Sequence, residues 1–346
     1  MKKNHDAIKS SCSRAVRLFV LLLTLAGGTG RAWADVIDVT SASDLNMTGG
    51  NTYRVTGDVT IDNRITIAED ATVTLLLCDG CTLNASKGIE LSKGRTLIIN
   101  GEANNSGTLT AKGYDYESGI GAYEYGNLII NGGTVNATGV SYGAGIGGNR
   151  DNKKAGTITI NGGKVNARGN NGAGIGGGGD YDYDETTGIC GDVNINGGQV
   201  DAIGWPGIGP GWVYGTKKSG TLTMGWTKLS DYIHIKTTDN NGDFNHFGKR
   251  LNSVRITDGD LFFFNGTTNF ATADNIMNND NFTLRPYSYD IGKICNSGMT
   301  DYGASGIDDY YYFTGNVIDI VPVVKDMMGR TLTLGTDYTV AHKEEC

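Results

Sequence analysis

Proline is scarce in this chain, and long apolar runs are scarcer still. The 346 residues include only 4 prolines but 54 glycines, so glycine is at about twice its usual share. Hydrophobic residues make up 38% of the chain and charged residues 19%. An intrinsically disordered chain has fewer apolar residues and more charge. We therefore expect a folded protein with a thin, elongated core.

The sequence has one marked apolar run, residues 18 to 26, and it lies near the N-terminus. Basic residues precede the run, and Ala32-Trp33-Ala34 supplies an A-x-A cleavage site before Asp35, which is the layout of a secretory signal peptide. The run is too short for a bilayer, which needs roughly 20 apolar residues. We predict that residues 1–34 are a signal peptide, and that the mature chain is secreted or displayed at the cell surface without a transmembrane segment.

Positive charge is also in short supply. The whole chain carries a net charge of −8, and removal of residues 1–34 takes away six basic residues and one acidic residue, which moves the net charge to about −13. Such a balance opposes binding to nucleic acid and to anionic lipid. We expect no nucleic-acid partner.

Cysteine is rare, and its count is odd once the signal peptide is removed. The remaining five are Cys78, Cys81, Cys190, Cys295 and Cys346. An odd number in an exported chain leaves one cysteine unpaired or bonded to another molecule. Cys78 and Cys81 bracket Asp79-Gly80, and a turn there can carry a disulfide. A zinc site needs a second cysteine pair at similar spacing, which the chain lacks.

The abundant glycine belongs to an internal repeat. The segments TLIINGE (96–102), NLIINGGTVNATG (127–139), TITINGGKVNARG (157–169) and DVNINGGQVDAIG (192–204) place asparagine at 100, 131, 161 and 196. Between them lie SGIGA (118–122), GAGIGG (143–148), GAGIGGG (172–178) and PGIGP (206–210), and TLTMG (221–225) is a weaker last copy. A repeat of about 30 residues indicates a solenoid.

Each repeat alternates apolar and polar residues in short strands. Ile158 and Ile160, then Val165 and Ala167, then Ile175 are the apolar set of one copy, with the residues between them facing outward. A row of antiparallel hairpins is the alternative, because Asn-Gly favours tight turns. The constant register favours an all-β fold, a right-handed parallel β-helix in which each strand pairs with its counterpart one coil away.

Glycine and asparagine have distinct uses in such a coil. Glycine adopts positive φ without steric cost and asparagine tolerates the left-handed region, so both are expected at the corners. We also expect the four repeat asparagines to stack in a column and to hydrogen-bond along the axis, as in cross-β ladders.

The repeats divide the chain into five parts. We predict a signal peptide (1–34), an N-terminal cap (35–52), the parallel β-helix (53–225), a mixed β region that closes the rod (226–316) and a truncated Ig-like module or linker (317–346).

The units INGGTVNATG with GAGIGGN and INGGKVNARG with GAGIGGG resemble the glycine-rich repeats of exported surface proteins of gut anaerobic bacteria. Those proteins are similar to pectate-lyase-like right-handed β-helices, and some are described as carbohydrate-binding. Separately, TLTLGTDYTV (331–340) resembles a stretch of the Ig-like modules of bacterial surface proteins. The resemblance implies an adhesin-like protein.

Loops between the strands carry tyrosines interleaved with acids, as in YDYES (114–118) and GDYDYDETTG (179–188). Equivalent loops of a solenoid lie on one flank, so their aromatic side chains can form one surface. Rigid aromatic rings suit the apolar faces of sugars and lose little conformational entropy on binding. The predicted ligand-binding residues are Tyr114, Tyr116, Tyr123, Tyr125, Tyr142, Tyr181, Tyr183, Trp205 and Trp212, with a carbohydrate or a host-matrix glycan as the partner.

A calcium site is a weaker prediction. Asp180, Asp182 and Asp184 alternate as in the first half of a calcium loop, but the later glycine and bidentate glutamate are missing at the required spacing. Glycine-rich loops such as GAGIGGG are not phosphate sites, since no helix and no Lys-Ser/Thr follows.

Three functions are compatible with the sequence, and the pattern of outward residues favours a non-catalytic one. A polysaccharide lyase or hydrolase would need a cluster of carboxylates and bases on the outward strand positions. Those positions carry mostly Thr, Asn, Lys and Gln, and His234 is interpreted as an exposed strand residue outside any ligand set. The prediction is therefore a glycan-binding surface protein, with the β-helix enzyme and a structural stalk without ligand as alternatives.

Overall fold

The structure is a computed structural model in which every described regular element is a β-strand. It describes residues 35–180, 186–212, 218–228, 230–238, 251–256, 262–265, 267–269, 279–286, 303–305 and 323–325, and positions 331 and 333. The predicted signal peptide, residues 1–34, lies outside the described residues. The chain divides into two compact units, Met1–Tyr287 and Ser288–Cys346. No helix long and apolar enough to cross a membrane occurs in the described part of the chain.

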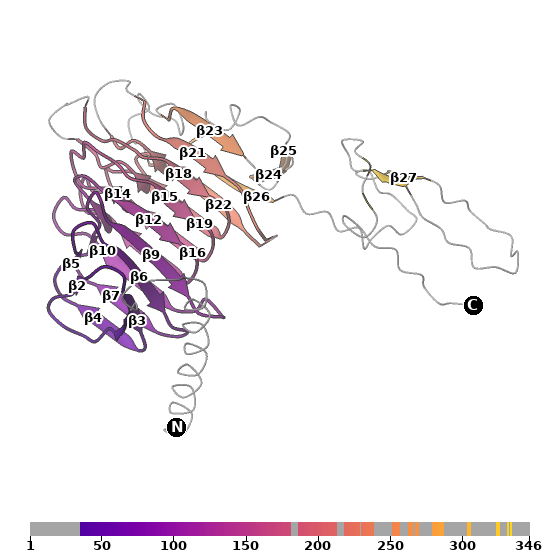
Figure 1. Ribbon diagram of the computed structural model, residues 1–346. Coiled ribbons are helices and arrows are strands. Elements are labelled where there is room, and N and C mark those ends of the chain that lie inside the picture. The colour runs from indigo at the N-terminus through magenta and orange to yellow at the C-terminus, as the bar shows by residue number, and fades with distance from the viewer. Residues whose placement is uncertain are drawn as a thin grey trace, which may run out of the picture. The chain divides into compact units, whose positions relative to one another are not determined.

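The first unit is a right-handed parallel β-helix with three sheets, and each coil between its two end coils contributes one strand to each sheet in turn (Figure 1). In the order of their pairing, the strands of the first sheet are β1 (Val36–Asp38), β3 (Thr52–Val55), β6 (Thr72–Leu77), β9 (Thr96–Gly101), β12 (Asn127–Ile130), β15 (Ile158–Ile160), β18 (Val193–Ile195), β21 (Thr221–Met224) and β23 (Ser253–Ile256).

The second sheet begins with parallel strands and ends with antiparallel ones. Its strands are β4 (Asp58–Ile61), β7 (Thr82–Ala85), β10 (Thr108–Lys112), β13 (Thr134–Thr138), β16 (Lys164–Arg168), β19 (Gln199–Gly204), β22 (Tyr232–Thr237), β26 (Asn281–Pro286), β24 (Phe262–Phe264) and β25 (Thr267–Asn269). Pairing is parallel as far as β22, and β26, β24 and β25 are added antiparallel.

The third sheet has the shortest strands, which are β2 (Asn46–Met47), β5 (Ile65–Ile67), β8 (Ile89–Glu90), β11 (Ile120–Ala122), β14 (Ile146–Gly148), β17 (Ile175–Gly176) and β20 (Ile208–Gly209). In the second unit, β27 (Gly303–Ser305) and β28 (Val323–Lys325) form an antiparallel pair.

Inward-facing residues stack in register along the axis. On the first sheet Leu97 pairs with Leu128, Leu128 with Ile158, and Ile158 with Val193, and each of the four side chains is at most 1% exposed. Burial of one such side chain stabilises the fold by roughly 1.5–3 kcal/mol. The alternation predicted from the sequence is therefore confirmed, and one continuous core runs through the coils.

The predicted asparagine column is present. The side-chain amide of Asn131 donates to Asn100 Oδ1, that of Asn161 to Asn131, and that of Asn196 to Asn161, each at 2.8 Å. The asparagines do not adopt positive φ, contrary to the expectation that asparagine would share the corners with glycine. The second glycine of each Asn-Gly-Gly takes that conformation instead, with φ of 78° to 94° at Gly133, Gly163 and Gly198.

A second glycine column explains the GIG motif. Gly121, Gly147, Gly176 and Gly209 pair in register on the third sheet and have φ between 126° and 147°. A Cβ atom at Gly147 would collide with the carbonyl of Gly176 on the next coil. Glycine is therefore required for the third-sheet strands to stack at this distance.

Parallel pairing extends beyond the predicted helix segment of 53–225 at both ends. β1 pairs with β3 and β2 with β5, so the predicted cap of 35–52 already has solenoid pairing. At the other end, β22 and β23 pair in parallel with β19 and β21. Most of the predicted Ig-like module of 317–346 lies outside the described residues and stays a prediction.

The turn at Cys78 and Cys81 has the predicted shape, with Gly80 at a φ of 72° and the Cys81 N–H bonded to the Cys78 carbonyl at 3.1 Å. Both cysteines are present as thiols, as is Cys190. The structure therefore has no disulfide across this turn, although the turn could carry one.

Candidate functional site

Four aromatic side chains meet where loops fold over the third sheet. Tyr116 lies in the loop before β11, Tyr142 in the loop before β14, Trp205 in the loop before β20, and Trp212 just after β20. Ring centroids are 6.2 Å apart for Tyr116 and Tyr142, 6.3 Å for Tyr142 and Trp212, and 5.4 Å for Trp212 and Trp205. We call these four residues the aromatic row. The fold thus brings together side chains that are up to about 95 positions apart in the sequence.

Neighbouring rings of the aromatic row meet at a shallow tilt. Neighbouring rings are inclined by 30° to 33°, and such offset arrangements are favourable for aromatic pairs. Tyr116, at one end, is 47% exposed, whereas Tyr142, Trp205 and Trp212 are partly buried. The row therefore stabilises the loops that carry it and also presents an aromatic edge to solvent.

Two predicted tyrosines are exposed but lie outside the row. Tyr114 is 55% exposed and Tyr123 is 46% exposed. The ammonium group of Lys87 lies 5.3 Å from the Tyr114 ring centroid. Among the described residues, Tyr123 has no ring contact, so it offers a natural control for the row.

Tyr125 was predicted to belong to the same surface, and this is wrong. Its side chain is 2% exposed, and its hydroxyl accepts a hydrogen bond at 2.8 Å from the backbone N–H of Gly191, two coils away. Burial is the main reason why the pKa of Tyr125 lies well above its usual value, and the nearby Cys190 and Asp192 raise it further. Tyr125 therefore ties coils together inside the protein and is closed to a ligand.

The other predicted residues lie in the loop after β17. Tyr181, Tyr183, Asp182 and Asp184 lie outside the described residues, so the calcium site stays a prediction. Asp180 is described: its side chain is 1% exposed, and its N–H donates to the carbonyl of Trp212 at 2.6 Å. Within the described ranges, no group of three or more His, Cys, Asp or Glu is placed to hold a metal ion.

Charged groups lie directly against the aromatic row. The Arg150 guanidinium is 4.5 Å from the Tyr116 ring centroid, and its Nε donates to Asp151 Oδ2 at 2.8 Å. A cation over an aromatic face contributes about 0.5–2 kcal/mol. Arg150 and Asp151 thus fix the exposed end of the row and add polar groups beside it.

Asp151 and Asp180 form a carboxyl pair beside the row. Burial raises the pKa of Asp151, the Asp180 side chain raises it further, and the Arg150 charge opposes both. The Oδ1 atom of Asp151 is buried without a hydrogen-bond partner.

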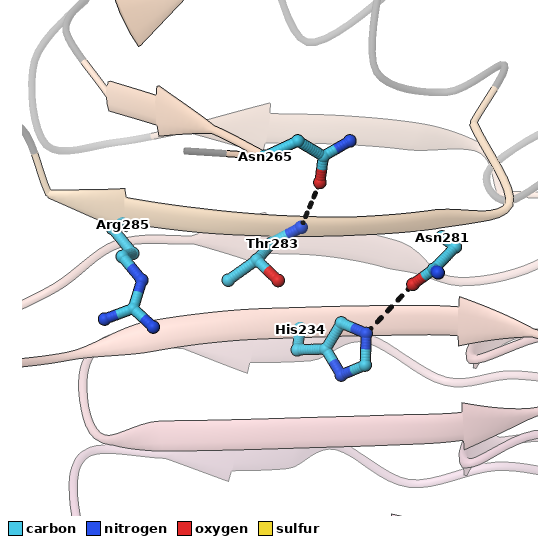
Figure 2. A pocket seen from close by; sticks show the side chains of 5 residues that line it. All are labelled: His234, Asn265, Asn281, Thr283 and Arg285. Atoms are coloured by element: carbon cyan, nitrogen blue, oxygen red, sulfur yellow. Dashed lines mark hydrogen bonds between the residues drawn. The ribbon is translucent and has the colours of Figure 1, made fainter. Parts of the chain in front are cut away.

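A polar cluster on the second sheet was missed by the sequence reasoning. His234 Nδ1 lies 2.9 Å from Asp201 Oδ1, and His234 Nε2 lies 3.0 Å from Asn281 Oδ1 (Figure 2). Asp201 also lies 3.7 Å from the Arg168 guanidinium. His234 is a strand residue, as interpreted, but it is partly buried rather than exposed and has a charged neighbour.

A signal for this cluster exists in the sequence. Val200 and Ala202 flank Asp201, and Ile233 and Ile235 flank His234, so aligning the buried residues of the two strands places the aspartate opposite the histidine. The observed register pairs these two residues.

Comparison with known proteins agrees with the architecture. A family model described as Beta helix repeat matches residues 128–150, 158–179 and 193–212. These three segments cover the coils of β12–β14, β15–β17 and β18–β20. No curated protein and no solved structure matches the chain significantly. The family match and the strand pairing agree that these coils are repeats of a right-handed parallel β-helix.

Proposed function

We propose that this protein is an exported, non-catalytic surface protein that binds carbohydrate through the aromatic row. The observation that carries the proposal is the continuous contact from Tyr116 through Tyr142 and Trp212 to Trp205. Sugar rings have apolar C–H faces and hydroxyl rims, so they combine well with aromatic surface bordered by hydrogen-bonding groups. Arg150 and Asp151 supply such groups beside Tyr116.

Rigidity of the row supports binding. Its loops are held by backbone hydrogen bonds between coils, such as Arg150 N–H to Tyr116 carbonyl at 3.0 Å and Gly179 N–H to Tyr142 carbonyl at 2.7 Å. A ligand that docks on fixed rings loses less of its binding free energy to ordering the protein. Export is supported by the signal-peptide pattern of residues 1–34.

The test is a glycan array followed by calorimetry on the purified full chain. Replacing Tyr116 by leucine keeps apolar packing but removes the flat ring, and we expect it to weaken the binding of the best glycan at least tenfold. Tyr123→Leu changes an equally exposed tyrosine outside the row and should leave the affinity within twofold of the wild type. A chain that binds no glycan, or a Tyr116→Leu variant that binds normally, would leave the aromatic row with a structural role only, as in a stalk.

A second candidate function, cleavage of the bound glycan, is favoured by the partly exposed Asp151, whose pKa is raised by burial and by Asp180. A carboxyl with a raised pKa can act as general acid or base in glycoside hydrolysis, whereas Asp180 is buried and can act only through Asp151. A reducing-end assay and an unsaturated-product assay on neutral and acidic polysaccharides test this function. Turnover that disappears in Asp151→Asn would make the protein an enzyme, and absence of turnover together with binding would support the first proposal.

A further inference from the structure

The outer face of the second sheet is basic, although the chain as a whole is acidic. From β7 to β26, the described strands of this sheet contain five Lys or Arg residues and a single carboxylate, Asp201. The five are Lys112, Lys164, Arg168, Lys236 and Arg285. The whole chain has a net charge of −8, so this basic face is an exception within an acidic protein.

The register arranges the basic side chains in order. Lys112 pairs with Thr138, Thr138 with Arg168, Arg168 with Ile203, and Ile203 with Lys236. The three cations of this column therefore stand on every second strand, which places them about 9.6 Å apart at the usual strand spacing of about 4.8 Å.

These cations are accessible, and most have no acidic partner. All five side chains are exposed. Arg168 is the one that faces a carboxylate, at 3.7 Å from Asp201. Among the described residues, the other four have no ion pair. Unpaired cations gathered on one face create a local potential that attracts anions.

A hollow of about 550 Å³ lies at the end of the basic face and is lined by His234, Asn265, Asn281, Thr283 and Arg285 (Figure 2). The Arg285 guanidinium lies 5.2 Å from the Tyr232 ring centroid. Asp201 and Asn281 hold the His234 ring on both sides. Asn265 is fixed by accepting the Thr283 N–H at 2.9 Å. The hollow thus combines one guanidinium that has no acidic partner among the described residues with oriented amide, hydroxyl and imidazole groups.

We propose that the basic face binds an anionic glycan, a sugar chain with carboxylate or sulfate groups, and that one acidic group sits beside Arg285 in the hollow. Amide and hydroxyl groups around it suit sugar hydroxyls. The charge spacing argues against nucleic acid, which carries one phosphate per roughly 3.4 Å of each strand in a duplex. A glycan with an acidic group on alternate sugars is charged much more sparsely. This site lies on a different sheet from the aromatic row and does not depend on it.

The experiment uses three polymers with one backbone: dextran, carboxymethyl-dextran and dextran sulfate. We expect the full-length protein to bind at least one of the two anionic forms in calorimetry, with an affinity that falls as salt is added, and not to bind dextran on this face. The carboxylate and sulfate forms identify which acidic group is preferred. Single-stranded DNA serves as a polyanion without the sugar chain.

The paired substitution Lys236→Gln with Arg285→Gln should weaken the binding of the anionic dextran at least tenfold. The control is Arg255→Gln, which removes an exposed cation from the first sheet and should change the affinity by less than twofold. Circular dichroism and the unfolding midpoint verify that each variant is folded.

Failure to bind either anionic dextran, equal weakening by Arg255→Gln, or tighter binding of DNA would overturn the proposal. Two variants separate this proposal from the proposed function. Tyr116→Leu should still bind the anionic dextran, whereas the Lys236 and Arg285 double variant should still bind any glycan that the aromatic row binds.

Discussion

On the first sheet, outward positions of the central coils are mostly asparagine, threonine and isoleucine, whereas on the second sheet the equivalent positions include five cations. Both sheets bury the same kind of side chain inside, such as Leu128 on the first and Val135 on the second. The comparison shows that stacking of coils fixes the inward residues and the corner glycines. Outward residues are free to differ between sheets, and specific binding groups can accumulate there.

The largest effect on stability is expected from a substitution that disturbs the stacking of the coils on which both sheets depend. Gly147→Ala puts a Cβ against the Gly176 carbonyl at a φ of 126°, and we expect a loss of about 3 kcal/mol or more in the free energy of unfolding, because overpacking and backbone strain add. The control is Gly57→Ala, where a Cβ meets nothing within 4 Å and the change should stay within about 0.5 kcal/mol. Urea unfolding measures both. Equal stability of the two variants would contradict tight stacking on the third sheet.

A buried cross-coil bond gives the next largest effect. Tyr125→Phe removes the acceptor of the Gly191 N–H, and a buried donor without a partner costs about 1–3 kcal/mol. Tyr123→Phe removes an exposed hydroxyl and should be neutral. The two midpoints of thermal unfolding provide the measurement, and coincident midpoints would show that the Tyr125 hydroxyl is not needed to connect the coils.

The asparagines of the two sheets differ in the number of side-chain hydrogen bonds that they make. Asn161 takes part in two side-chain hydrogen bonds on the first sheet, whereas Asn166 on the second sheet makes one, to Asn136 at 2.7 Å. At about 0.5–1.5 kcal/mol per bond, we expect Asn161→Ala to destabilise the protein by about 1–2 kcal/mol and Asn166→Ala by about half as much. Asn194→Ala, on the first sheet but outside the column, is the control. If the asparagine column does not stabilise the fold, Asn161→Ala should be no less stable than Asn194→Ala.

The smallest effect concerns pH. Burial and Asp180 raise the pKa of Asp151 in the folded protein, so the folded state binds the proton more tightly than the unfolded state does. This stabilisation is fully present below the unfolded pKa of about 3.9 and is lost as the pH rises through the higher folded pKa.

Asp151→Asn cannot ionise, and asparagine tolerates the φ of 57° at this position. At pH 7 the variant should be as stable as the wild type or more stable, by less than about 1 kcal/mol, and the difference should vanish near pH 3. Unfolding curves at several pH values test this, and a variant that is less stable at pH 7 than at pH 3, relative to the wild type, would reverse the sign we assign.

The sequence was sufficient for features that repeat at constant spacing. The intervals between Asn100, Asn131, Asn161 and Asn196 predicted their column, and alternation predicted the inward residues. Glycine was correctly expected at the corners, with positive φ at Gly133 and Gly163. The asparagines of the column do not share that conformation, which composition alone does not reveal.

The candidate site was predicted only in part, because its contacts depend on loops of unequal length. Tyr116, Tyr142, Trp205 and Trp212 were correctly grouped on one flank, but burial of Tyr125 depends on Gly191, which lies 66 residues further along the chain. The Asp201–His234 contact likewise requires the register of β19 with β22. A repeat motif does not determine the conformation of an irregular loop between two strands, so the contacts of that loop cannot be predicted from it.

The central claim is that equivalent strands of successive coils lie side by side in parallel, since both proposed binding surfaces depend on that register. Ile129 and Thr159 pair across neighbouring coils of the first sheet, and strands about 4.8 Å apart are within disulfide reach. With cysteines at 129 and 159, mild oxidation followed by peptide mass spectrometry should find these two residues cross-linked. Cysteines at 129 and 134, which an antiparallel hairpin through Asn131-Gly132 would place opposite one another, should stay reduced. A cross-link in this second pair and none in the first would contradict the parallel β-helix.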